Sequence, residues 1–375
     1  MRSTWQARAV AAAVLVLMAA LVALPAALPA AAAPAELPTP GPATGLPATG
    51  LPATTPAIGA LTGVSVAAPG RAFAVGLRQI ARWNGRSWRP TSVSLPAGTT
   101  LSAITAVGPR AAWAAGTTQA GRTYLLRWTG ARWRHVASPS PSGSHLSGLA
   151  AGSVRDAWAV GYQHENVSQG TCARCRTLIL HWNGVRWRRV PSPTPSSWDA
   201  LESATVVSAR DAWAAGVSGG RPLILHWNGR SWRVSASPVP HGAAPLLYGI
   251  SAASARDAWA VGTAGGRVLL EHWNGTSWRI AAGPATAAAE LTSVAVLSAR
   301  DAWADGDAGP RTLTLHWNGA RWRVVASPQP DPAMGRGLSG ISGTSADDVW
   351  IAGYYAGGGK GLLALRDGNG WRPVD

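Results

Sequence analysis

The stretch SARDAWAVGTAGGRVLLEHWNGTSWR, residues 254–279, combines an Asp, a His, an Asn and three tryptophans, residue types that active sites use. It is not unique in the chain. Close copies occupy 208–232 and 298–322, a further copy spans 154–187, and more divergent copies flank these. Seven copies begin at leucines: Leu61, Leu101, Leu146, Leu201, Leu247, Leu291 and Leu338. Self-similarity at a period of about 40–55 residues indicates a repeat architecture.

The tryptophans follow the same repeat. Of the 21 Trp in the chain, 19 fall into three repeat columns, and only Trp5 and Trp198 stand outside them. One column lies in the DAWAVG segment, where Phe73 replaces Trp in the first copy. The other two columns flank the Asn-Gly dipeptide, as Trp273 and Trp278 do. Tryptophan placed this regularly indicates a role in the architecture.

Each copy predicts four short strands, which in the fifth copy are LYGISA, DAWAVG, VLLEHW and SWRIAA. Asn-Gly between the last two is typical of a two-residue type I′ turn, because that turn needs positive φ at both central residues. We therefore expect a tight turn at Asn274 and Gly275, with Trp273 and Trp278 as diagonal neighbours. One four-stranded unit cannot bury its own faces. Seven units predict an all-β fold, a seven-bladed β-propeller of four-stranded antiparallel blades over 61–375.

The Asp and His of the opening stretch pair in this scheme. If Gly262 faces Arg267 across a four-residue loop, Asp257 directly faces His272, close enough for a hydrogen bond. The same register predicts four structural pairs: Asp156 with His181, Asp211 with His226, Asp257 with His272, and Asp301 with His316. The first two copies lack the Asp and the His together. Joint loss and fourfold repetition favour a structural contact over a catalytic site, and no catalytic residue is assigned.

The repeats resemble known propeller families. An Asp, a His and a Trp tied together once per blade resemble the hydrogen-bond network of WD-repeat propellers. The strand order looks more like Asp-box (sialidase-type, BNR) repeats and photosystem assembly-factor repeats, and the chain is most similar to secreted DxWAVG…HWNGxxW repeat proteins of actinobacteria. The Asp-box pattern needs an Asp five residues before the last Trp, where this chain has Trp273 and its equivalents. The resemblance therefore implies a propeller, but not sialidase chemistry.

The N-terminus predicts export. Arg2 and Arg8 precede an apolar stretch and then small residues, which is typical of a secretory signal peptide over 1–33; the alternative is a retained membrane anchor. Residues 34–60 form a Pro/Ala/Thr-rich linker that we expect to be disordered. No later segment is apolar and long enough to cross a membrane. We expect a secreted or cell-surface protein, and a monomer.

The two cysteines, Cys172 and Cys175, form a C-x-x-C motif. In an exported chain a close pair is most simply a disulfide. Half a zinc site is the alternative, but no second Cys/His pair at ligand spacing is visible. We expect no metal and no cofactor.

The formal net charge is +16, and all but one of the 33 basic residues are Arg. Many of these arginines occupy repeat positions, so we expect an evenly basic propeller. Such a surface could bind an anionic cell-wall polymer, an acidic polysaccharide or nucleic acid through salt-dependent contacts. Specific nucleic-acid binding is not expected, because the chain has no basic run and no nucleic-acid-binding motif.

Departures from the repeat mark the candidate ligand-binding residues. The longest insertion, 162–175, contains His164 and Glu165 and follows the second strand of the third copy. Trp198 lies in the loop that leaves the same copy, and strand order places both on one face of the ring, at the boundary of blades three and four. A second departure is ADGDAGP in the sixth copy, where Asp305, expected opposite Thr312, and Asp307 predict a polar pocket or a cation site.

Two functional classes follow. The first is an exported, non-catalytic binding or scaffold propeller that takes carbohydrate, an anionic cell-wall polymer or another exported protein, with aromatic side chains stacking on sugar rings. The second is a sialidase-like glycoside hydrolase or lyase. Its acids would have to converge on the central channel, but Glu202 is the only charged residue in the channel-lining segments of the seven first strands. This scarcity of carboxylates favours the binding propeller.

Overall fold

The computed structural model describes residues 58–168, 171–240, 244–329, 337–355, 359–368 and 370–374, with backbone alone at 165–168 and 171–173. All regular secondary structure in these residues is β-strand. A helix long and apolar enough to cross a membrane is therefore not found among them. The predicted signal peptide and all but the end of the predicted linker lie outside the described residues. One compact unit spans 56–167 and 172–375 and contains the whole repeat region.

Seven four-stranded antiparallel sheets make up this unit, which confirms the seven-bladed β-propeller. Blade one comprises β1 (Leu61–Ala68), β2 (Arg71–Gly76), β3 (Gln79–Trp83) and β4 (Trp88–Thr91). Blade two comprises β5 (Thr100–Gly108), β6 (Ala111–Thr117), β7 (Thr123–Trp128) and β8 (Trp133–Val136). Blade three comprises β9 (Ser144–Ser153), β10 (Asp156–Ser168), β11 (Thr171–Trp182) and β12 (Trp187–Arg189). Blade four comprises β13 (Asp199–Ser208), β14 (Asp211–Ser218), β15 (Arg221–Trp227) and β16 (Trp232–Ser235).

The last three blades follow the same plan. Blade five comprises β17 (Leu246–Ser254), β18 (Asp257–Ala264), β19 (Arg267–Trp273) and β20 (Trp278–Ile280). Blade six comprises β21 (Ala289–Ser298), β22 (Asp301–Ala308), β23 (Arg311–Trp317) and β24 (Trp322–Val325). Blade seven comprises β25 (Gly337–Ser345), β26 (Asp348–Tyr355), β27 (Lys360–Arg366) and β28 (Trp371–Pro373).

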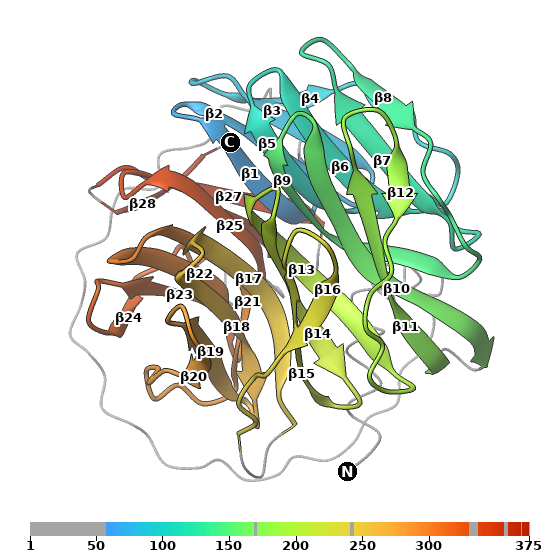
Figure 1. The fold of residues 1–375 in the computed structure, drawn as a ribbon. Helices are drawn as coiled ribbons and strands as arrows, with labels where there is room; N and C mark the ends of the chain where they lie inside the picture. Colours follow the sequence, from blue (N-terminus) through green and yellow to red (C-terminus); the bar gives the residue numbers. More distant parts are fainter. Residues whose placement is uncertain are drawn as a thin grey trace, which may run out of the picture. The chain divides into compact units, whose positions relative to one another are not determined.

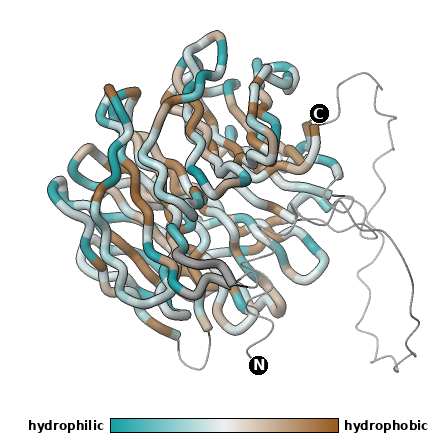
Figure 2. Tube along the Cα trace, turned by 90° about the vertical axis from the view of Figure 1, so that its right-hand side faces the viewer, coloured by the Kyte–Doolittle hydropathy of each residue, from teal (hydrophilic) through white to brown (hydrophobic). Residues whose placement is uncertain are grey.

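The blades form a closed ring, with the first strand of each blade at the centre and the fourth at the rim (Figure 1). First strands of neighbouring blades contact one another, and β25 contacts β1 in the same way. Each sheet contains four strands that are consecutive in the chain, so none of the described strands is exchanged where blade seven meets blade one. Apolar segments run along the strands and hydrophilic segments occur at many of the turns (Figure 2).

The tryptophan columns pack between the blades. The Trp259 ring of blade five lies between Trp317 and Trp322 of blade six, with ring centroids 4.9 and 5.0 Å away. Trp350 of blade seven packs on Trp83 and Trp88 of blade one, both at 5.1 Å, so the same contact closes the ring. Burying an aromatic side chain of this size contributes on the order of 4 kcal/mol of transfer free energy. The tryptophans therefore hold neighbouring blades together.

In blades four to six the two hairpin loops have the reverse of their predicted lengths. In blade five the second strand runs on to Ala264, which pairs with Arg267. The tight turn is Gly265-Gly266, and both residues have positive φ (60° and 73°), as a type I′ turn needs. The Asn-Gly loop has four residues instead of the predicted two, and Trp273 and Trp278 are directly opposite rather than diagonal.

The side chain of Asn274 explains the wider loop. Its Oδ1 accepts hydrogen bonds from the backbone N–H groups of Thr276 and Ser277, both at 3.0 Å. An Asn side chain used in this way replaces the backbone bond of a tighter turn. Equivalent bonds close the loop after Asn183, Asn228 and Asn318.

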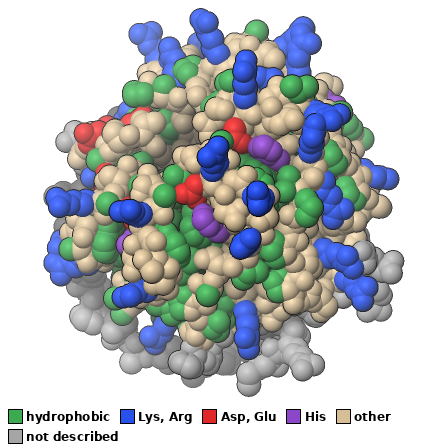
Figure 3. All heavy atoms as spheres, viewed as in Figure 1, with side chains coloured by type: hydrophobic (Ala, Val, Ile, Leu, Met, Phe, Trp, Pro, Cys, Tyr) green, Lys and Arg blue, Asp and Glu red, His purple; other side chains and the backbone are tan. Residues whose placement is uncertain are grey.

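The antiparallel order gives the ring two distinct faces. The turns between second and third strands lie on one face, together with the loops that lead from each blade to the next; we call it the insertion face. The turns between first and second strands and the Asn-Gly loops lie on the opposite face, which we call the Asn-Gly face. Basic side chains are spread over the face seen in Figure 3, where carboxylates are few and two groups of them lie beside histidines.

Candidate binding sites and the Asp–His pairs

Each of the four Asp–His pairs forms a hydrogen bond on the Asn-Gly side of its blade. The His Nε2 to Asp Oδ1 distance is 2.7–2.9 Å for the four pairs, Asp156–His181, Asp211–His226, Asp257–His272 and Asp301–His316. The register that predicted this contact is wrong by two residues in blades four to six, since each His directly faces the column Trp. A shift of two keeps a side chain on the same face of a strand, so the Asp still reaches the His as a diagonal neighbour.

The surroundings of a pair are aromatic. In blade five the His272 ring stacks on Trp259, with centroids 4.4 Å apart and planes at 28°. Asp257 is the first residue of β18 and is only 9% exposed. The pair thus ties the start of one strand to the end of the next and covers one side of the buried indole. Among the described residues, no group of three or more His, Cys, Asp or Glu could hold a metal ion.

The insertion of blade three is a hairpin extension of β10 and β11 rather than a loop. Its two edges contact the loops that enter and leave the blade. On the β10 edge, the His164 N–H donates to the carbonyl of Gly143 at 2.9 Å. On the β11 edge, the Cys175 N–H donates to the carbonyl of Ser197 at 3.0 Å, and Cys175 and Trp198 form a parallel bridge. Trp198 therefore adjoins the insertion as predicted, whereas His164 lies at its other edge.

Trp198 is half-buried. Its backbone N–H donates to Ser196 Oγ at 3.0 Å, and its carbonyl accepts from the Gly219 N–H at 2.8 Å. The side chains of Glu165 and Cys172 lie outside the described residues, so the role of the first and the predicted disulfide of the second stay predictions.

A pocket of about 400 Å³ lies where β11 meets the loop from β12 to β13. Two exposed arginines of β11, Arg174 and Arg176, line it from one side. Three hydroxyl side chains, Thr194, Ser196 and Ser197, line it from the loop that continues into Trp198. The sequence analysis did not single out these residues. Two arginines at alternate positions of the insertion were the available signal, because they share one face of a strand.

A cluster of titratable groups lies between the insertion and the channel. Tyr162 and His145 face each other across β9 and β10, with their rings stacked 4.9 Å apart. Burial lowers the pKa of His145 to about 4, and the nearby His164 adds to this shift. Burial, with a smaller effect of the Glu202 charge, raises the pKa of Tyr162 to about 12. Burial also raises the pKa of Glu202, against the effect of a hydrogen bond with Ser147. All three shifts favour the uncharged forms.

The ADGDAGP segment of blade six, which departs from the repeat, is buried in its first half. Asp305 is fully buried. It faces Thr314 and not Thr312 as predicted, because the register between the second and third strands differs by two residues from the predicted one. Its Oδ1 accepts a hydrogen bond from Thr292 at 3.2 Å, and burial raises its pKa well above the usual value. Because a bound cation would itself favour the ionised carboxylate, the predicted polar pocket or cation site at Asp305 stays a prediction.

Asp307 lies nearer the surface than Asp305. It is half-buried, faces Glu290 on β21 and accepts a hydrogen bond from the Leu338 N–H at 3.3 Å. It therefore keeps its place among the candidate ligand-binding residues of the insertion face.

No protein family and no curated protein matches the chain. Solved structures share its fold at low identity. YCF48 bound to D1 peptide is 16% identical, with a TM-score of 0.57 over 83% of this chain and 93% of that one. The WD40 repeats of RRP9 are 11% identical (TM-score 0.59; 84% and 95%). Virginiamycin B lyase from Staphylococcus aureus is 15% identical (TM-score 0.59; 82% and 95%). These likenesses show the propeller fold alone.

Proposed function

We propose that this protein is an exported, non-catalytic binding propeller whose ligand is an anionic polysaccharide or cell-wall polymer. The observation that carries the proposal is the insertion-face pocket lined by Arg174, Arg176, Thr194, Ser196 and Ser197. Guanidinium groups bind carboxylate or phosphate groups through paired N–H donors, and hydroxyl groups suit the hydroxyls of sugars. Trp198 ends this loop and follows Ser197 of the pocket lining directly in the chain.

The positive charge of the chain supports a negatively charged ligand. Of the formal net charge of +16, only Arg2 and Arg8 lie in the predicted signal peptide, so the exported chain stays strongly basic and attracts polyanions at long range. The pocket arginines would bind the polyanion at a defined site. Repetition in the ligand would match a propeller that exposes arginines on many blades. Affinity of this kind falls as salt rises.

The carboxylates of the insertion face support a binding role over hydrolysis. Glycoside hydrolysis needs two carboxyl groups that flank one bond, one of them ionised. Asp305 is fully buried and so out of reach of a polymer in solution, and burial shifts the pKa of both Glu202 and Asp305 upward, away from the ionised form. The lyase among the structural neighbours is only 15% identical and shares the fold alone, so its chemistry is not carried over to this chain.

The test is binding of the chain from residue 58 onward to immobilised polygalacturonate, with neutral dextran as the control. We expect retention on polygalacturonate that weakens with salt, and none on dextran. The eluted polymer is then sized by chromatography. Equal retention on both polymers, or none, would contradict the proposed ligand. Shortened polygalacturonate would restore the hydrolase or lyase alternative.

A further inference from the structure

A second pocket lies on the Asn-Gly face, where blade one departs from the repeat at three positions. Blade five has Asp257, Trp259 and His272 at these positions, and blade one has Arg71, Phe73 and Arg82. The strand register confirms the equivalence, because Phe73 directly faces Arg82 as Trp259 faces His272. Relative to blade five, blade one lacks the carboxylate, has a phenyl ring in place of the larger indole, and has two additional guanidinium groups.

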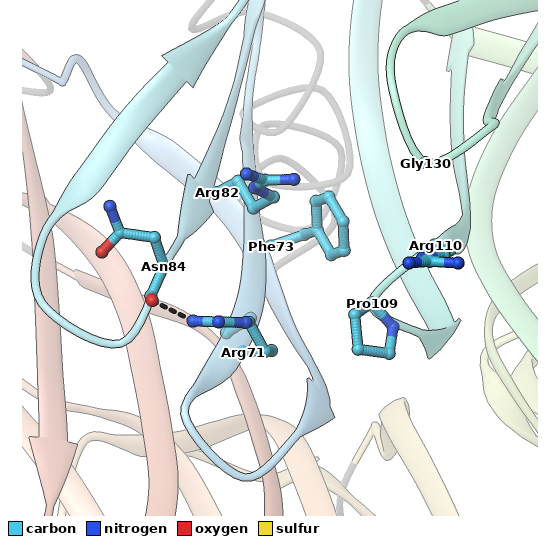
Figure 4. Close-up of a pocket in the computed structure, with 8 residues that line it drawn as sticks. Arg71, Phe73, Arg82, Asn84, Pro109, Arg110 and Gly130 are labelled. Carbon is cyan, nitrogen blue, oxygen red and sulfur yellow. Dashed lines mark hydrogen bonds between the residues drawn. The ribbon is translucent and has the colours of Figure 1, made fainter.

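The pocket measures about 350 Å³ and is shared by blades one and two. Arg71, Phe73 and Arg82 line it from blade one, and Pro109 and Arg110 lie across from them on blade two (Figure 4). Asn84 and Gly130 also line it, each from the loop between the third and fourth strands of its blade. No Asp or Glu is among the described residues of the lining.

The three guanidinium groups retain donors that could bind a ligand. Arg71 donates from Nη1 to the carbonyl groups of Asn84 and Gly70, which leaves its other N–H groups. Arg82 lies over the ring of Trp128, with Cζ 5.7 Å from the centroid. Arg110 is exposed and makes no hydrogen bond or ion pair with any described residue.

The surrounding charge is of one sign, contrary to the even distribution expected. From Leu61 to Val136, blades one and two contain no Asp and no Glu. They contain ten arginines: Arg71, Arg78, Arg82, Arg86, Arg89, Arg110, Arg122, Arg127, Arg132 and Arg134. The neighbouring positive charges repel one another, and an anion in the pocket would relieve this repulsion.

We propose that this pocket binds a phosphate or sulfate group. Three guanidinium groups around one cavity favour an anion, and a tetrahedral oxyanion offers several acceptor oxygens to N–H donors from different directions. The site does not rest on the proposed function, because it lies on the opposite face from the Arg174–Arg176 pocket. The group is either a free inorganic ion or part of a polymer.

The repeat itself supplies the test variant. Arg71→Asp with Arg82→His rebuilds the pair that blades three to six contain, so the double variant should fold. Binding is measured by calorimetry at low salt with three probes: inorganic sulfate, dextran sulfate and neutral dextran. We expect the rebuilt variant to bind sulfate or dextran sulfate at least about tenfold more weakly than the wild type. The probe that responds identifies the free ion or the polymer as the source.

A charge-matched control separates the pocket from the general charge. Arg230→Asp with Arg321→His removes the same charge from exposed loops of the same face, in blades four and six. It should bind within about twofold of the wild type. Equal weakening by the two double variants, or no weakening by the rebuilt one, would overturn the proposal.

A single substitution tests the contribution of Arg110, which lines the pocket from blade two. Arg110→Gln should weaken binding of the responding probe several-fold. Arg256→Gln, the equivalent change beside Asp257 in blade five, should leave it unchanged. Equal effects of these two variants would also overturn the site.

Discussion

The Nε2 atom of His272 lies 2.7 Å from Oδ1 of Asp257, although the two residues are not opposite each other on their strands. Trp259 occupies the opposite position, and the His ring stacks on it. The histidine thus joins an indole face to a nearly buried carboxylate. The same relationship recurs in three other blades, as expected of a structural element and not of a single catalytic site.

Asp257→Ala should lower the free energy of unfolding by about 1–3 kcal/mol, because His272 loses its hydrogen-bond partner. Urea unfolding of the wild type and variant measures the difference. Polygalacturonate binding should be unchanged. A variant as stable as the wild type that no longer binds would show that the pair belongs to a binding site.

The repeat columns predict this fold well, because they reflect one simple requirement, the burial of large aromatic side chains. Trp259 and its equivalents are large apolar rings that need burial, and seven such positions at a period of about 40–55 residues are met by packing them between seven blades. Loop length is harder to predict. Asn274-Gly275 and Gly265-Gly266 both suit a type I′ turn, and only the bonds to the Asn274 side chain decide which loop is wider.

The candidate sites are less predictable than the fold. The insertion and Trp198 stood out as departures from the repeat, and they do adjoin each other. The burial of Asp305 and the meeting of Arg110 with Arg71 and Arg82 depend on how neighbouring blades pack. Such contacts join residues that are distant in the sequence, so no local pattern reports them.

Glu271 should make stability depend on pH. It is fully buried, both carboxyl oxygens accept from Ser237 Oγ, and burial raises its pKa to about 7. A raised pKa means that the folded protein holds a proton that the unfolded chain has lost. This residue therefore costs stability as the pH rises from about 4.5 to 7.

Glu271→Gln removes this dependence. We compare the free energy of unfolding of the variant with that of the wild type at each pH. This difference should be about 3 kcal/mol more in favour of the variant at pH 8 than at pH 4.5. Urea unfolding at both pH values measures the change. A difference between wild type and variant that is constant with pH would contradict the pKa shift.

Cys172 and Cys175 should be bonded to each other in protein made under oxidising conditions, because the chain has no other thiol. Intact mass after alkylation, with and without prior reduction, measures this. Alkylation of both cysteines should require the reductant. Two free thiols with one equivalent of zinc would support the metal alternative instead.

Trp198→Ala should weaken polygalacturonate binding about tenfold, or roughly 1.4 kcal/mol. Trp198→Phe keeps an aromatic surface and should lose much less. Because Trp198 is half-buried, melting temperature is measured for both variants. A large fall in melting temperature with unchanged binding would make Trp198 a packing residue.

The central claim is that the insertion-face pocket holds the anionic ligand. Its most direct test is calorimetric titration of polygalacturonate into the wild type, the Arg174→Gln, Arg176→Gln double variant, and a control with Arg230→Gln and Arg321→Gln. The account predicts at least about tenfold weaker binding for the first variant and a change within about twofold for the control. Equal affinities for the two double variants would contradict it.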